Sequence, residues 1–250
     1  MKVSVVIPVY NEQAYIGACL DSLLRQEEPP DEIIVVNNNS TDNTIKIARK
    51  YNVKLVNERK QGMIPARNRG FNEAKYEIIA RTDADTLVPP DWIKKIKKNF
   101  RSEKLIALSG PAHLYPLPNL VQTSNWLTVS VFNFCKKILG HDCLYGANMT
   151  IRKSAWEKVK NEVCLDDSQV HEDLDLAVHL APYGRIKFDK NLVVSSSARR
   201  WKYPESYFEY AHRVVKLLKK HKKFDVSQKS TQLVKKIVSK AFLTDQKSSY

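Results

Sequence analysis

Short apolar runs alternate with amphipathic segments through the first 110 residues. Five runs are rich enough in apolar residues to be buried strands, at 3–9, 32–36, 53–56, 76–80 and 104–109. Apolar residues at helical spacing lie between the first four, in a helix that opens near Asn11 and in helices at 44–51 and 65–74. Strands separated by helices of this length form βαβ units, so the pattern predicts an α/β fold with parallel strands.

The second half of the chain is less regular. Residues 143–151 are typical of a loop and a short strand, a helix opens at His171 and ends near Gly184, and 186–195 is predicted to be one strand. The uncharged run at 114–135 contains Pro116 and Pro118, which favours a buried or groove-lining helix over contact with a bilayer. No apolar stretch reaches the ~18 residues of a membrane-spanning helix.

The last fifty residues form a basic helical pattern. Apolar residues fall on one stripe from Pro204 onward, and lysines crowd the opposite side. Such helices lie on a membrane surface or pack on a domain with a solvated lysine face, and the sequence leaves both readings open. We therefore expect a domain at 1–200 and a basic helical extension at 201–250.

The charge and the cysteines narrow the class of protein. A net charge of +14 favours anionic partners, namely nucleotides, nucleic acid or an anionic membrane surface. The four cysteines have no C-x-x-C spacing, which predicts free thiols in a reducing compartment and no zinc site. Three histidines (His171, His179 and His212) lack metal-like pairing, so we assign them structural roles. Met1-Lys2 leads directly into the first strand, so we expect no signal peptide.

The most informative polar cluster is Thr82-Asp83-Ala84-Asp85, which directly follows the buried strand at 76–80. Two aspartates one residue apart suit a hard divalent cation, which is commonly held by one or two carboxylates together with substrate phosphates. The cluster therefore indicates a phosphate-bearing substrate.

Other polar clusters follow the neighbouring strands, with Tyr10-Asn11-Glu12 after the first and 37–42 after the second. Ligands of open α/β sheets bind outside the carboxyl ends of the strands. Ordinary turns and helix caps explain Asn11 and Asp42 but explain Asp83 and Asp85 poorly.

A second acidic cluster opens the helix at 171. Acids in a first helical turn are favoured by the helix dipole, but His171-Glu172-Asp173-Leu174-Asp175 holds more acids than a cap needs. We therefore favour a catalytic role for this cluster.

Taken in order, these motifs resemble family 2 glycosyltransferases of the GT-A fold. The resemblance rests on Val5–Glu12, Ser40–Asp42, Ala66–Asn68, Asp83–Asp85 and Glu172-Asp173, and it covers about residues 1–200. It implies a Rossmann-like, mixed but mainly parallel sheet flanked by helices. It also implies inverting transfer of a sugar from a nucleotide-diphosphate sugar to an acceptor hydroxyl or phosphate, with Mn²⁺ or Mg²⁺ as cofactor.

The resemblance also assigns roles on the donor side. The nucleoside pocket would be lined by Pro8, Tyr10 and Glu12, and the base would meet Asn37 and Asn38. Arg67 would support the diphosphate side of the pocket. Within Asp83-Ala84-Asp85, Asp85 would bind the cation that neutralises the leaving diphosphate, and Asp83 would hold the ribose or share the metal.

On the acceptor side, the resemblance makes Asp173 the general base that deprotonates the acceptor hydroxyl. Glu172 would orient Asp173 or the acceptor. The Gly146-Ala147-Asn148 segment would shape the acceptor side of the site.

Two departures from the family pattern affect the donor site. Many members carry aspartates after the second strand, whereas this chain has Asn37-Asn38-Asn39, and an amide both donates and accepts hydrogen bonds. The identity of the base therefore stays open. Residues 193–197 lack the late histidine of some members, so Arg199 or Arg200 is assigned to the diphosphate, with plain surface charge as the alternative.

The partners follow from the same resemblance. We expect a nucleotide-sugar donor, a glycan or lipid-linked acceptor, and a cytoplasmic protein with peripheral contact to the inner membrane face through its C-terminal helices. A sugar nucleotidyltransferase would need a glycine-rich loop after the first strand, where no glycine occurs before Gly17. An inactive sugar-nucleotide-binding domain stays an alternative. A basic nucleic-acid-binding protein leaves the acidic clusters unexplained, so no nucleic acid is expected.

Overall fold

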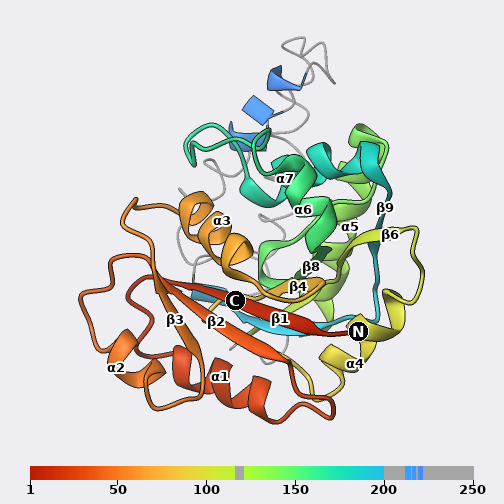
Figure 1. Cartoon of the computed structure of the whole chain (residues 1–250). Coiled ribbons are helices and arrows are strands. Elements are labelled where there is room, and N and C mark those ends of the chain that lie inside the picture. Colours follow the sequence, from red (N-terminus) through yellow and green to blue (C-terminus); the bar gives the residue numbers. More distant parts are fainter. Residues whose placement is uncertain (116–120, 200–211, 215, 218, 222–250) are drawn as a thin grey trace, which may run out of the picture.

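The chain folds around one large mixed sheet and one small sheet (Figure 1). The computed structural model describes residues 1–115, 121–199, 212–214, 216–217 and 219–221. The large sheet has the order β3-β2-β1-β4-β8-β6-β9. Its strands in chain order are β1 Val3–Val9, β2 Glu32–Asn37, β3 Lys54–Asn57, β4 Ile78–Arg81, β6 Leu105–Ser109, β8 Met149–Arg152 and β9 Arg185–Phe188.

Strands β1 to β4 are parallel, as the βαβ pattern predicts. Strand β8 is inserted between β4 and β6 and runs antiparallel to both, which makes the sheet mixed. The register pairs Val9 with Asn37 and Val6 with Arg81, so the carboxyl ends of β1, β2 and β4 lie together at one edge. Every residue of β1 is buried, because this strand is central and covered on both faces.

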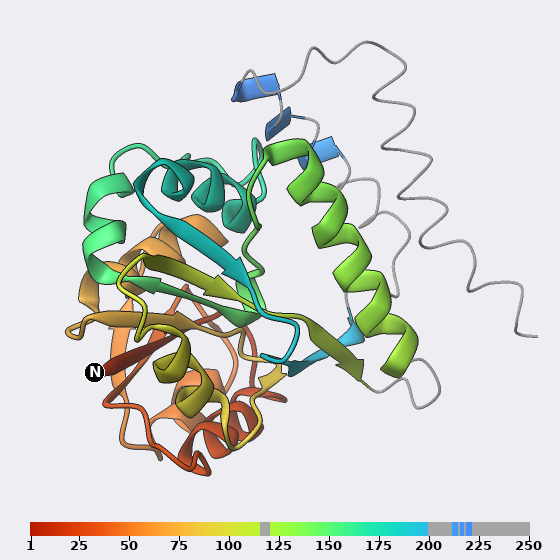
Figure 2. The same ribbon diagram turned by 90° about the vertical axis from the view of Figure 1, so that its right-hand side faces the viewer.

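Helices cover both faces of the large sheet (Figures 1 and 2). On one face, α1 and α4 pack against Val3, Val5 and Ile7 of β1. On the other face, α3, α6 and α7 pack against Val6 of β1 and Ile34 of β2. The helices are α1 Ile16–Leu24, α2 Thr44–Ala48, α3 Met63–Glu73, α4 Trp92–Asn99, α5 Val121–Leu139, α6 Lys153–Val159 and α7 Glu172–Leu180, with short 3₁₀ turns η1 Gly146–Asn148 and η2 Ala181–Tyr183.

A small sheet of three strands joins the carboxyl-end edge to the C-terminal part of the domain. It has the order β5-β10-β7, with β5 Thr86–Leu87, β7 Ala112–Tyr115 and β10 Val194–Ser197. The single strand predicted at 186–195 is therefore wrong. The chain leaves the large sheet after Phe188, turns at Asp189, whose carbonyl accepts from Leu192 N–H at 3.0 Å, and enters the small sheet at Val194.

The helical prediction for 114–135 is confirmed in type, since α5 occupies Val121–Leu139. Within the part of the chain that the structure describes, no helix is both long and apolar enough to cross a membrane. The basic extension predicted from residue 201 lies almost wholly outside the described residues, so the boundary near residue 200 stays a prediction.

The contact between α3 and β1 generates a stability prediction. A Cβ atom on Gly70 would lie 2.2 Å from Cγ1 of Val6 and 3.0 Å from Cγ2 of Val36. Overpacking of this kind costs about 1–3 kcal/mol, which exceeds the ~1 kcal/mol that alanine gains over glycine inside a helix. We expect Gly70→Ala to lower the midpoint of urea unfolding.

Gly17→Ala is the matched control, because a Cβ there meets its nearest neighbours at 3.6 Å or more, which is ordinary contact. We expect this α1 variant to be as stable as the parent chain or more stable. Equal midpoints for both variants would show that α3 moves away from β1 at no cost.

Candidate active site

The polar clusters predicted after β1 and β2 meet at the carboxyl edge of the sheet. The Thr41 N–H donates to Asn11 Oδ1 at 2.8 Å, and the Glu12 N–H donates to Thr44 Oγ1 at 2.7 Å. Asn11 and Asn39 adopt positive φ angles of 54° and 66°, which asparagine tolerates better than most residues. These turns, at 10–12 and 37–44, and the Asp83–Asp85 segment after β4 form a polar edge, called here the rim. Tyr10 is exposed on it, whereas Pro8 is buried within β1.

The two asparagines assigned to the base differ in how deeply their side chains are buried. The Asn38 side chain is buried, donates to the carbonyls of Glu58 and Lys60, and accepts from Gly62 N–H at 2.8 Å. Its amide therefore organises the 58–62 loop, and contact of Asn38 with a base stays a prediction. Asn37 is half-buried; it donates to Asn57 Oδ1 at 3.0 Å and accepts from the Ser40 N–H.

The Asp83-Ala84-Asp85 cluster follows β4, as predicted. Its two carboxylates pair with different arginines. Asp83 Oδ1 lies 2.9 Å from Nη2 of Arg81, and its side chain is 29% exposed. Asp85 is nearly buried, and its Oδ2 lies 3.0 Å from Nε of Arg199. Ala84 is buried between them. Carboxylate oxygens of this kind are the ligands that Mg²⁺ and Mn²⁺ prefer.

Arg199 follows β10 and reaches across the rim. Its guanidinium pairs with Glu12 as well as Asp85, and it lies over the ring of Tyr15 at 4.7 Å. Glu12 Oε2 is buried and has no hydrogen-bond partner among the described residues. The arginine thus neutralises a pair of carboxylates whose oxygen atoms also suit a divalent cation. Arg200, the other arginine assigned to the diphosphate, lies outside the described residues.

A buried ionic chain connects the rim to α7. Glu172 at the start of α7 pairs with Nη1 of Arg67 at 2.7 Å and with Nη1 of Arg81, and Arg81 continues to Asp83. Arg67 is fully buried and also donates to Asn68 Oδ1, so its guanidinium supports Glu172 from inside the protein. Arg67 reaches the rim only through Glu172 and Arg81, and its predicted support of the diphosphate side of the pocket stays a prediction.

The two arginines decide the charge of Glu172. Burial alone would raise the pKa of Glu172, but the charges of Arg81 and Arg67 and their hydrogen bonds outweigh burial and hold this pKa below its usual value. Glu172 is therefore ionised at neutral pH.

The pKa of Asp173 is shifted in the opposite direction, upward. Burial, followed by the negative charge of Glu172, raises the pKa of Asp173 to about 7, although Asp173 Oδ2 accepts the Gly146 N–H at 3.0 Å. The side chain is half-buried and belongs to the first turn of α7. A carboxylate that titrates near neutrality is suited to take up and release a proton.

The three residues assigned to the acceptor side have different positions. Gly146 borders the ionic chain, since a Cβ there would lie 3.0 Å from Arg81 Nη1 and from Glu172 Oε1. Ala147 is buried, and its carbonyl accepts from Thr82. Asn148 is fully buried, where it accepts from Trp92 Nε1 and donates to two carbonyls of the 111 and 192 turns. The Asn148 amide is engaged in the core, and its predicted part in shaping the acceptor side stays a prediction.

Arg81, which lies between Glu172 and Asp83, was not among the residues predicted from the sequence. The available signal was an arginine directly after the apolar run Ile78-Ile79-Ala80, since a charged residue is almost never fully buried unless it is paired. Tyr115 was also missed; its hydroxyl donates to the Asp85 carbonyl at 2.7 Å and fixes the backbone of the acidic cluster.

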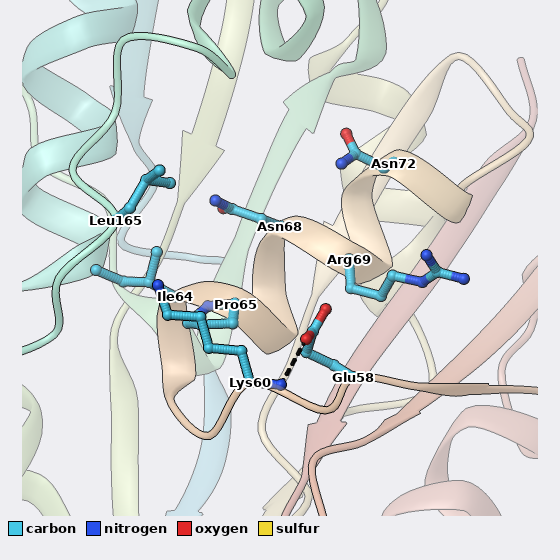
Figure 3. Close-up of a pocket in the computed structure, with 8 residues that line it drawn as sticks. All are labelled: Glu58, Lys60, Ile64, Pro65, Asn68, Arg69, Asn72 and Leu165. Atoms are coloured by element: carbon cyan, nitrogen blue, oxygen red, sulfur yellow. Dashed lines mark hydrogen bonds between the residues drawn. The ribbon is translucent and has the colours of Figure 1, made fainter.

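A pocket of about 310 Å³ lies beside α3, on the surface between the 58–60 loop and Leu165 (Figure 3). Its lining combines exposed apolar Leu165 with amides and charged side chains, among them Asn68 and Arg69. Asn68 also binds Arg67, so the pocket adjoins the ionic chain but is separate from the rim carboxylates.

Comparisons with known proteins agree on one family. A model described as glycosyl transferase family 2 matches residues 4–159, which is well over half of the chain. The chain is 28% identical over 200 residues to a chondroitin synthase of Pasteurella multocida (strain Pm70), covering 74% of this chain and 19% of the relative. It is 35% identical over 106 residues to the putative glycosyltransferase EpsH of Bacillus subtilis, covering 40% and 31%. The chain thus spans less than a third of the length of these relatives.

Solved structures share the fold. The mannosyltransferase PcManGT of Pyrobaculum calidifontis, solved in complex with GDP-Man and Mn²⁺, aligns with a TM-score of 0.71 at 21% identity, over 100% of this chain and 76% of that chain. TarS 1–349 of S. aureus with UDP-GlcNAc gives 0.65 at 21% identity, over 97% and 72%. The mixed sheet, its flanking helices and these likenesses confirm the GT-A fold, and with the family match they show that the chain belongs to glycosyl transferase family 2.

Proposed function

We propose that the chain is an inverting, metal-dependent glycosyltransferase that moves a sugar from a nucleoside-diphosphate sugar to an acceptor hydroxyl. The observation that carries the proposal is that the chain has two acidic sites in different electrostatic environments. One carboxylate is ion-paired with an arginine, and the other has a raised pKa. Asp85 lies on the rim in an ion pair with Arg199, whereas Asp173 is the carboxyl whose pKa burial raises to about 7. One site suits a charged diphosphate and its cation, and the other suits proton transfer.

Asp85, with Asp83, would hold the divalent cation. The bound ion would supply charge neutralisation for the leaving diphosphate. The proposed ligands suit this role, because both are carboxylates at the carboxyl end of β4 and each attracts a positive group in the structure, namely Arg81 for Asp83 and Arg199 for Asp85.

Asp173 acts as the general base of the transfer. Its carboxylate takes the proton of the acceptor hydroxyl as the oxygen forms its bond to the anomeric carbon, while the bond from that carbon to the diphosphate oxygen breaks. Attack from the side opposite the leaving group inverts the anomeric centre. The Gly146 N–H donates to Asp173 Oδ2 at 3.0 Å and the Leu174 N–H donates to Oδ1 at 2.8 Å, so backbone groups fix the orientation of the carboxylate.

Glu172 and its two arginines position the base. Arg67 and Arg81 keep Glu172 ionised, and that negative charge contributes to the raised pKa of Asp173. The base therefore retains enough affinity for a proton at neutral pH to remove one from a hydroxyl.

Arg199 leaves its carboxylates when donor and cation bind, and its guanidinium then binds the diphosphate. Support comes from its position: it pairs with Asp85, which the cation also needs, and it lies at the rim where the nucleotide would bind. A guanidinium suits phosphate oxygens because it donates two parallel hydrogen bonds.

The acceptor is a glycan or a lipid-linked saccharide, as the likeness to chondroitin synthase suggests. The basic residues from 201 onward would bring the protein to the cytoplasmic face of a membrane, as a peripheral cytoplasmic enzyme. Donor choice between UDP- and GDP-sugars stays open in this proposal, since the solved relatives include one of each.

A donor panel tests the proposed function first. UDP-, GDP- and dTDP-sugars are each added with and without Mn²⁺, and thermal shift and slow donor hydrolysis are measured. Stabilisation by one nucleotide class that requires Mn²⁺, together with hydrolysis, supports the enzyme. Binding without hydrolysis favours an inactive domain, and a strong salt-dependent affinity for DNA or RNA in place of donor binding favours the nucleic-acid alternative.

Two rim variants should separate the cation site from the diphosphate site. We expect Asp85→Asn to abolish the Mn²⁺-dependent part of donor binding, because a metal-ligating charge is lost. Arg199→Ala should weaken donor binding and strengthen the binding of Mn²⁺ alone, since the competing guanidinium is gone. Calorimetric titration measures both affinities, and an unchanged Mn²⁺ affinity in Arg199→Ala would contradict the exchange of partners.

Removing the base should slow turnover with little change in donor affinity. For Asp173→Asn we expect a loss of about 10²–10⁴-fold in kcat, the usual contribution of general base catalysis. Donor hydrolysis, in which water replaces the acceptor, provides the readout. Glu157→Gln on α6 is the control, because its side chain is solvent-exposed and should leave kcat unchanged.

The pH dependence follows from the raised pKa of Asp173. The base works only when deprotonated, so kcat/KM should rise with pH and level off above about 7. Glu172→Gln removes a neighbouring negative charge and leaves Arg81 and Arg67 unbalanced, which lowers the pKa of Asp173. The acid limb of the profile should therefore shift to lower pH, and a limb that stays in place would exclude Asp173 as the titrating base.

A further inference from the structure

Helix α7 carries a second cluster of chemically active side chains, on the side away from Asp173. Asp175 is 1% exposed, His179 and His221 are half-buried, and one ligand atom from each lies within 4.8 Å of the other two. Asp175 and His179 are four residues apart on α7. His221 belongs to the described residues 212–214, 216–217 and 219–221, called here the C-terminal segment. His179 lacks metal-like pairing in the sequence, because its partner His221 lies 42 residues further along the chain, and the fold brings the two together.

We propose that Asp175, His179 and His221 bind a divalent transition-metal ion of the Zn²⁺ class. Imidazole nitrogen and carboxylate oxygen are ordinary ligands of Zn²⁺. Two ligand atoms about 2.1 Å from a tetrahedral ion lie about 3.4 Å apart. His221 Nε2 lies 3.0 Å from Asp175 Oδ1, so a small separation of this pair makes room for the ion, and a fourth position stays open for water.

Neighbouring groups already orient two of the three ligands. The Cys164 N–H donates to Asp175 Oδ2 at 2.8 Å, which fixes the carboxylate and leaves Oδ1 toward His221. His179 Nδ1 lies 3.6 Å from Asp175 Oδ2 and donates to the Asp175 carbonyl at 2.8 Å, which fixes the ring beside the carboxylate. In the neutral tautomer that makes this bond, Nε2 carries a lone pair. Metal-binding histidines commonly donate their second nitrogen to a carbonyl in this way.

This site differs from the cation site of the rim in place and chemistry. Residues two apart on a helix point to different sides, so Asp175 faces away from Asp173, which contacts Gly146. The rim offers carboxylate oxygens, whereas this cluster offers two imidazoles. We therefore expect Zn²⁺ or Co²⁺ here and Mn²⁺ or Mg²⁺ at Asp85.

The ion would connect the C-terminal segment to the helix that bears the catalytic acids. Leu217 is fully buried and packs in one cluster with Leu174 and Val178 of α7, and the His221 N–H donates to the Leu217 carbonyl at 3.1 Å. Ligation of His221 would hold this segment on α7, whose first two residues are Glu172 and Asp173. The site is thus a structural clamp that does not touch the reacting atoms.

The competing reading is a hydrogen-bonded cluster in which His221 simply satisfies the buried Asp175 carboxylate. The variant His221→Gln separates the two readings, because glutamine retains a hydrogen-bond donor but is a poor ligand for Zn²⁺. His179→Ala removes the second imidazole. His212 is an exposed histidine of the same segment, so His212→Ala is the matched control. Asp85→Asn removes a ligand of the proposed rim site, so that Zn²⁺ bound by this variant is not bound there.

The test is a titration of the full chain, stripped of metal with a chelator, with Zn²⁺ followed by calorimetry and with Co²⁺ followed by its visible absorption. We expect one tight ion per chain and a rise in Tm with Zn²⁺, both retained in His212→Ala and Asp85→Asn. His221→Gln and His179→Ala should each weaken Zn²⁺ binding at least ~10-fold, since even outer-shell partners contribute that much.

Two results would overturn the proposal. The first is the absence of a tight Zn²⁺ ion in the parent chain. The second is a Zn²⁺ affinity that is the same in the parent, His179→Ala and His221→Gln. Circular dichroism of each variant without metal confirms that a loss of affinity does not arise from a failure to fold.

Discussion

The arrangement of the active site depends on one buried carboxylate between two buried arginines. Glu172 forms ion pairs with both Arg67 and Arg81, and Arg81 in turn pairs with Asp83. Breaking a buried pair by removing one partner typically costs about 3–5 kcal/mol, because a charge is left without compensation. The start of α7, the end of β4 and the interior of α3 are therefore fixed relative to one another, and this fixed frame determines where Asp173 points.

The same charge pattern divides the site into two electrostatic environments. Glu172 and Asp173 are adjacent in the chain, yet the arginines keep Glu172 ionised while burial and the charge of Glu172 raise the pKa of Asp173. At the rim, Arg199 balances Asp85 and Glu12. Glu172 thus has two arginines in direct contact, whereas Asp173 accepts only backbone N–H groups, from Gly146 and Leu174.

Much of the fold and part of the site follow from the sequence. The strands predicted at 3–9 and 104–109 correspond to β1 and β6, because apolar runs act locally. The clusters at Asp83–Asp85 and Glu172-Asp173 were found from their places after a strand and at a helix start. Asn38 and Asn148 were assigned to ligands, and in the structure both bond to groups of the protein itself. Sequence gives the residue type and its place at a strand end, whereas hydrogen-bond partners come from segments distant in the chain.

The sequence by itself therefore determined the α/β class, the polar edge of the sheet and the family resemblance, since these depend on periodicity and on motif order. Only the tertiary structure decided that Arg67 is buried behind Glu172, that the run at 186–195 divides between two sheets, and that Asp175, His179 and His221 converge. Each of these outcomes requires contacts across 40 to more than 100 residues, such as the bond from Arg67 to Glu172 with a separation of 105. Such contacts arise from packing around the shared core, which local sequence patterns do not encode.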